Sequence, residues 1–98
     1  MRNYRVIATE KVYDVLHAAG LDTDHQCFDD LMFGCLAAME SRIDSDIVDL
    51  IYNMNPGDRT KQEIEFDLID YARSCGVRDL DEVLKKAVAI GKTALLIH

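Results

Sequence analysis

The stretch DHQCFDDLMFGCLAAMES, residues 24–41, carries the most complete helical pattern in the chain. Its apolar residues recur at spacings of three and four, which places them on one face of an α-helix. They are Cys27, Phe28, Leu31, Met32, Cys35, Leu36 and Met39. Thr23 before this run, with Gln26 three residues later, matches a capping box, a pattern typical of helix starts. Because Phe33 lies off the stripe, we expect this helix to be central and covered on more than one side.

The segment before it predicts another helix, over residues 10–19. Thr9 belongs to the residue types that cap helix starts, and apolar residues follow it at helical spacing. Gly20 stands where a helix ends in a left-handed residue, and the apolar Leu21 completes this type of stop.

The second half of the chain predicts three more helices, over residues 45–54, 60–75 and 80–90. Asp44 or Ser45 is placed to open the first of them. An Asn-Pro-Gly turn ends it, because proline disfavours helix in the residue before it.

The last two of these helices have their own boundary residues. Thr60 and Glu63 form a second capping box pattern. Gly76, followed by an apolar valine, repeats the glycine stop. Asp79 is placed to cap the final helix, and Gly91 is expected to close it.

Two short apolar stretches, Tyr4–Ile7 and Thr93–His98, lie near the ends of the chain. One alternative is that the two stretches pair as a small two-stranded sheet. For the second stretch, a last helical turn or a part of an interface are further alternatives. We predict an all-α fold, a compact bundle of about five short helices in one domain, residues 1–98. The expected core comprises Val15, Leu16, Phe28, Leu31, Met32, Leu36, Ile47, Ile51, Leu68, Ala72, Val83 and Leu84.

Composition argues against several classes of protein. Apolar residues make up 49% of the 98 residues, too many for a disordered chain. No stretch approaches the ~20 apolar residues of a membrane span, and the polar helix faces are too acidic for membrane binding. The apolar start is too short for a signal peptide, so we expect a cytoplasmic protein. Cys27, Cys35 and Cys75 are expected to be small core residues and not disulfide partners.

The charge is concentrated in one part of the chain. Between Asp22 and Asp70, thirteen acidic residues stand against three basic ones, a net charge of −10 in a chain whose total is −7. The two flanking segments are therefore weakly positive. Several of the acids lie at helix starts, where capping explains them. Six of the acids left after this assignment are predicted to contact a basic partner: Asp29, Asp30, Asp46, Asp49, Asp67 and Asp70.

No metal, cofactor or catalytic site is predicted. His25, Cys27 and Cys35 are soft ligands, but a structural zinc site needs four ligands with short paired spacings. Two Asp-x-Asp pairs begin like calcium loops and lack the glycine and glutamate that such loops require. No serine or cysteine lies in a nucleophile turn, and there is no glycine-rich phosphate loop. We therefore do not expect an enzyme.

Direct binding to nucleic acid is also disfavoured. The glycine turn at Gly76 between two predicted helices resembles a helix-turn-helix, whose second helix would enter the major groove. The first turn of that second helix holds Asp79, Asp81 and Glu82. These carboxylates would face phosphates, whereas affinity for DNA depends on lysine and arginine.

These exclusions leave a protein-binding module, an inhibitor or decoy that meets a basic, nucleic-acid-handling protein. Its carboxylates would stand where phosphates lie. The analogy, one of size and charge and not of motif, is with small acidic helical proteins of phages and mobile elements, anti-CRISPR proteins among them. The first alternative is a shape-complementary regulator or immunity-type partner of a toxin or enzyme, anchored by an aromatic such as Tyr52, Phe33 or Tyr13. The second is a homodimeric structural module or a helix-turn-helix DNA-binding regulator.

Overall fold

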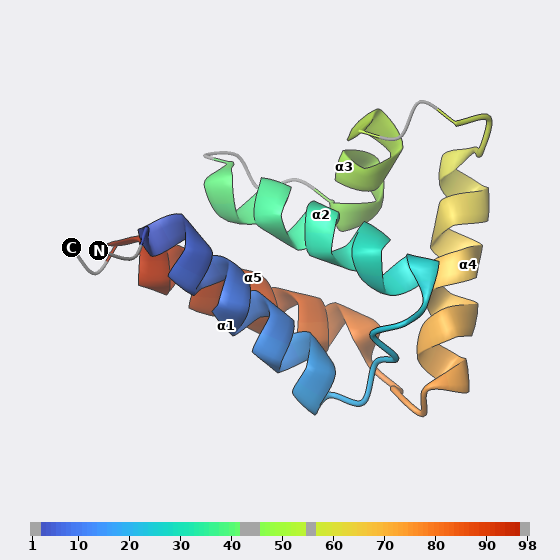
Figure 1. Cartoon of the computed structure of the whole chain (residues 1–98). Helices are drawn as coiled ribbons and strands as arrows, with labels where there is room; N and C mark the ends of the chain where they lie inside the picture. The colour runs from blue at the N-terminus through green and yellow to red at the C-terminus, as the bar shows by residue number, and fades with distance from the viewer. Residues whose placement is uncertain (1–2, 42–45, 55–56, 97–98) are drawn as a thin grey trace.

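The computed structural model describes residues 3–41, 46–54 and 57–96, which form five helices (Figure 1). The all-α prediction is confirmed. The helices are α1 (Tyr4–Ala18), α2 (Gln26–Glu40), α3 (Ile47–Met54), α4 (Lys61–Ser74) and α5 (Leu80–Leu96). The predicted helix opening at Asp44 or Ser45 and the predicted Asn-Pro stop lie outside the described residues.

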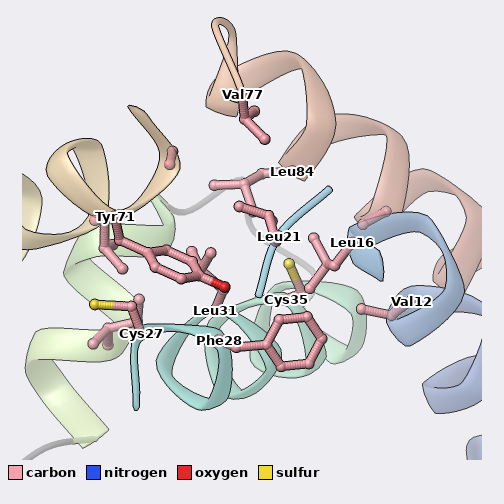
Figure 2. Packing of buried hydrophobic residues seen from close by; sticks show 14 of the residues in the cluster. Val12, Leu16, Leu21, Cys27, Phe28, Leu31, Cys35, Tyr71, Val77 and Leu84 are labelled. Atoms are coloured by element: carbon pink, nitrogen blue, oxygen red, sulfur yellow. The ribbon is translucent and has the colours of Figure 1, made fainter. Parts of the chain in front are cut away.

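Helix α2 is the centre of the bundle, as predicted, and packs against each of the other four helices. Its buried side includes Phe28, Leu31 and Cys35, which Figure 2 shows among residues from α1, α4 and α5. On another side, Gly34 allows α3 to approach closely, since an added Cβ would lie 2.7 Å from Cγ2 of Ile47.

Both ends of the described chain are helical, so the alternative of paired extended ends is wrong for Tyr4–Ile7 and for the part of Thr93–His98 that the structure describes. Helix α1 begins six residues before the predicted range of 10–19, because the side chain of Asn3 caps it by accepting a hydrogen bond of 2.8 Å from the amide of Arg5. Thr9 is inside the helix and donates its hydroxyl to the carbonyl of Arg5. Helices α1 and α5 pack side by side and antiparallel (Figure 1).

Gly91 lies inside α5, which corrects the prediction that it closes that helix. It is buried where α5 meets both α1 and α2. An added Cβ would clash with Sδ of Met39 and lie 3.0 Å from Cγ2 of Val12. Buried Ala87 and Ala94 on the same helix are also small. Small residues therefore set the close approach of α5 to its neighbours.

The end of α1, both boundaries of α4 and the start of α5 follow the predictions closely. Thr60 and Glu63 form the expected capping box at the start of α4. Gly20 and Gly76 have φ values of +101° and +82°, the left-handed conformation of a glycine stop. The carboxylate of Asp79 accepts from the amide of Glu82 at the start of α5.

The start of α2 differs from its prediction. Nδ1 of His25 caps the helix by accepting from the amide of Cys27 at 3.0 Å. Thr23 lies in the preceding turn, where the carboxylate of Asp22 accepts from the amide of Asp24. The ring nitrogen of His25 accepts from the amide two residues later, as the side-chain oxygen of a serine, threonine or aspartate would at this capping position.

The predicted core residues lie in or against the buried cluster. Seven of them are fully buried: Leu16, Phe28, Leu31, Ile51, Leu68, Ala72 and Leu84. The other five are partly buried and pack against these: Val15, Met32, Leu36, Ile47 and Val83. Across the described ranges, no helix is long and apolar enough to cross a bilayer.

Candidate protein-binding surface

A shallow hollow lies between the turn that precedes α2 and the exposed side of α4. Four carboxylates border it, those of Asp22, Asp30, Asp67 and Asp70. The one lysine or arginine among its lining residues is Arg59. We call this surface the acidic hollow. It is assembled from three segments far apart in the sequence.

Arg59 bridges two of the predicted contact residues. Its Nη2 lies 3.5 Å from Oδ2 of Asp30, and its Nη1 lies 3.7 Å from Oδ2 of Asp67. The side chains of Arg59 and Asp30 are 27% and 14% exposed, so this pair is partly shielded from water. Both distances are long for a charge-assisted hydrogen bond, so Arg59 acts as a shared positive charge between the two carboxylates and not as a tight bidentate partner.

The hollow has a hydrogen-bonded floor. The hydroxyl of Tyr71 donates to the carbonyl of Asp22 at 2.5 Å, and the His25 ring stacks on the Tyr71 ring with centroids 4.7 Å apart. The amide of Asp22 donates to Sγ of Cys75 at 3.4 Å. These contacts fix the turn before α2 against α4.

Two of the thiols, those of Cys27 and Cys35, are poor nucleophiles. Burial, and then the carboxylates of Asp30 and Asp67, raise the pKa of the Cys27 thiol. Deeper in the core, burial raises the pKa of Cys35 to about 12. Because the thiolate is the reactive form, neither thiol is activated at neutral pH.

The six predicted contact residues separate into three groups. Asp30, Asp67 and Asp70 border the acidic hollow together. Asp29 lies exposed in the first turn of α2, beside Asp30 in sequence but outside the hollow. Asp46 and Asp49 belong to the α3 region and do not line the hollow.

Two of these residues are already engaged within the chain. The carboxylate of Asp46 accepts from the amide of Val48 at 2.9 Å, so its assignment as an acid without a capping role is wrong. Asp49 forms an ion pair of 2.9 Å with Lys61, whose ammonium lies 5.4 Å from the centre of the Tyr52 ring. In the described part of the chain, Asp29 and Asp70 form no ion pair.

Sequence reasoning missed Arg59 and Tyr71 as parts of this surface. Arg59 is 29 residues from Asp30, and no local pattern announces that pairing. Tyr71 is buried on α4, and its hydroxyl is directed to the turn before α2. A buried tyrosine usually needs a hydrogen-bond partner for its hydroxyl, and this is the one feature of the sequence that could have indicated a role for Tyr71.

Two other features bear on function. Several aromatic side chains are exposed, with Phe33 at 63%, Tyr52 at 41% and Tyr13 at 40%. Among the residues that the structure describes, no three histidine, cysteine or acidic side chains are grouped so as to hold a metal ion. Comparison of the chain with protein-family models, curated proteins and solved structures finds no match.

Proposed function

We propose that this chain is a non-enzymatic protein-binding module, an inhibitor or decoy whose acidic hollow contacts a basic surface of a nucleic-acid-handling protein. The observation that carries the proposal is the gathering of Asp22, Asp30, Asp67 and Asp70 around one hollow with a single cation. The segment from Asp22 to Asp70 has thirteen acids against three basic residues, so neighbouring charges reinforce the field there.

Arg59 supports this proposal through its own geometry. Its guanidinium lies between the carboxylates of Asp30 and Asp67, so these two carboxylates can attract one cation together. An arginine of a partner would meet the same carboxylates and that of Asp70, which forms no ion pair with the described residues. Such contacts resemble those that a basic protein makes with phosphates, which is how a decoy of the phage anti-defence, anti-CRISPR-like kind would act.

The contact residues are not equivalent in this proposal. Asp29 and Asp70 are exposed and carry charges that no described ion pair neutralises. Asp30 and Asp67 both form an ion pair with Arg59, and Asp49 forms one with Lys61. We therefore assign the largest contribution to Asp70 in the hollow and to Asp29, which lies outside the hollow and next to Asp30 in sequence, and a smaller one to the paired acids.

A second candidate function is a shape-complementary regulator. The observation that favours it is Phe33, which is 63% exposed on the helix that forms the centre of the bundle. Aromatic residues often anchor interfaces, and loss of an anchor costs ~2 kcal/mol or more of binding free energy.

The test begins with capture of partners from cells of the source organism and continues with their measured affinities. Asp29→Lys with Asp70→Lys should weaken binding of the captured partner at least about tenfold, an effect of roughly 1.4 kcal/mol. The matched control, Asp14→Lys with Glu82→Lys, makes the same change in net charge on α1 and α5 and should weaken it much less. Equal loss of affinity in both variants would contradict the proposal, because binding would then depend only on the net charge of the chain. Unchanged binding in both, with loss in Phe33→Ala, favours the shape-based function.

A further inference from the structure

A groove lies along the side of α4 that faces α5. After the turn at Gly76, α4 and α5 diverge and do not pack against one another along their lengths (Figure 1). The space between them is a half-open groove of about 1350 Å³. Its lining includes the apolar side chains of Leu68, Ala72, Leu84 and Val88, with Val77 and Leu80 near the turn.

Four cationic side chains line the groove beside this apolar floor. On α5, Lys85, Val88 and Lys92 follow one another at helical spacing. Arg73 contributes from α4, and Arg78 lies in the turn between the helices. Within the described ranges, none of these four cations forms an ion pair.

Four acids also line the groove, and two of them have structural roles. Asp46 caps α3 through the amide of Val48, and Asp79 caps α5 through the amide of Glu82. Their carboxylates are partly satisfied by helix amides, which lowers their demand for an outside cation. The four acids balance the four cations in formal charge, but the charged groove residues of α5 beyond Asp81 are both lysines, Lys85 and Lys92.

The dimensions of the groove suit a helix better than a small molecule. The α5 wall runs from Asp81 to Lys92, a length of about 16 Å at 1.5 Å per residue. That is roughly three helical turns. The groove is also larger than the ~300–1,000 Å³ pockets that enclose small ligands, and it is open along one side.

We propose that this groove binds an amphipathic helix of a protein partner, with an apolar stripe flanked by acidic residues. The stripe would lie on Leu68, Leu84 and Val88, and the acidic flanks would meet Arg73, Lys85 and Lys92. This is the helix-in-groove mode of recognition, in which apolar anchors supply affinity and flanking charges supply orientation. The proposal does not rest on the acidic hollow. It gives the chain a second binding surface, on the other side of α4 from the acidic hollow.

A displayed library of helical peptides tests the proposal. The peptides are about 14 residues long, with leucine or isoleucine fixed at i, i+3 and i+7 and all other positions random. They are selected on the wild-type chain in the presence of excess Val88→Asp protein. We expect enriched peptides to carry more acidic than basic residues beside the stripe. Each should bind at least about tenfold more weakly to Lys85→Glu with Lys92→Glu.

The matched control changes the other side of α4. Asp67→Asn with Asp70→Asn alters the acidic hollow and should leave the peptide affinities unchanged. The lysine variants keep the test valid if Val88→Asp unfolds, because they change side chains on the groove wall and not in the core. Peptides that bind wild type and the lysine variants equally, or enriched peptides with neutral or basic flanks, would overturn the proposal. Self-association of the wild-type chain that is abolished by Lys85→Glu with Lys92→Glu would also overturn the proposal, because the groove would then bind a second copy of this chain.

Discussion

Nη2 of Arg59 lies 3.5 Å from Oδ2 of Asp30, so the loop before α4 is tied to the beginning of α2. Asp29 is next to Asp30 in sequence and has no such partner among the described residues. Reversing the two charges should therefore have different costs. Asp30→Lys would place two cations together in a partly shielded site and should lower the free energy of unfolding by about 1–2 kcal/mol.

Asp29→Lys should change that free energy by less than ~0.5 kcal/mol, as exposed substitutions usually do. Denaturant titration of both variants at low salt measures the difference. Equal costs at the two positions would mean that the Arg59 pair contributes nothing to the fold. For this reason, a charge reversal that includes Asp30 is a poor test of binding.

The Tyr71 hydroxyl, which donates to the carbonyl of Asp22, should contribute measurably to stability. Tyr71→Phe removes that hydrogen bond and should lower the free energy of unfolding by about 0.5–1.5 kcal/mol. The control is Tyr52→Phe, at a side chain that is 41% exposed, where no comparable loss is expected. Thermal or denaturant unfolding at neutral pH compares the two variants.

The same tyrosine should make stability depend on alkaline pH. Burial raises the pKa of Tyr71 above its usual value, so the folded state keeps this proton when the unfolded chain has lost it. The contribution is complete below the unfolded pKa of about 10 and decreases as pH rises above it. Between neutral pH and about pH 11, the wild-type chain should therefore lose more stability than Tyr71→Phe. Parallel curves for the two proteins would contradict this.

Close packing at Gly91 should not tolerate a branched side chain. Gly91→Val would overlap Met39 and approach Val12, and overpacking of this kind costs about 1–3 kcal/mol. Ala89→Val is the matched control because Ala89 lies exposed on the same helix. It should cost about 0.5 kcal/mol, the difference in helix propensity. A Gly91→Val protein as stable as this control would show that the contact between α5 and its neighbours is loose.

Local signals explain why most helix boundaries could be predicted from the sequence. The capping box of Thr60 and Glu63 and the left-handed stop at Gly76 depend only on residues within a few positions. Gly91 was wrongly read as a third stop. Its sequence context differs, because Lys92 follows it where an apolar residue follows Gly20 and Gly76. A glycine without that apolar partner is a better candidate for close helix packing.

The acidic surface could be predicted only in outline. The excess of carboxylates between Asp22 and Asp70 is evident in composition. Which of them are neutralised depends on contacts across the fold, such as Asp30 with Arg59, and these have no local pattern. The groove between α4 and α5 was missed for a similar reason. Periodicity predicts which side of a helix is apolar, but it does not predict whether a neighbouring helix covers all of that side.

The salt dependence of association with the captured partner tests the central claim most directly. If the acidic hollow makes the contact, the association rate constant should fall at least about tenfold as ionic strength rises from about 0.01 M to about 0.15 M, because the Debye length shrinks from ~30 Å to ~8 Å. Arg59→Gln removes the one cation in the hollow and should raise the rate at low salt. A rate constant that is insensitive to salt, unchanged in Arg59→Gln and in Asp29→Lys with Asp70→Lys, would contradict the account.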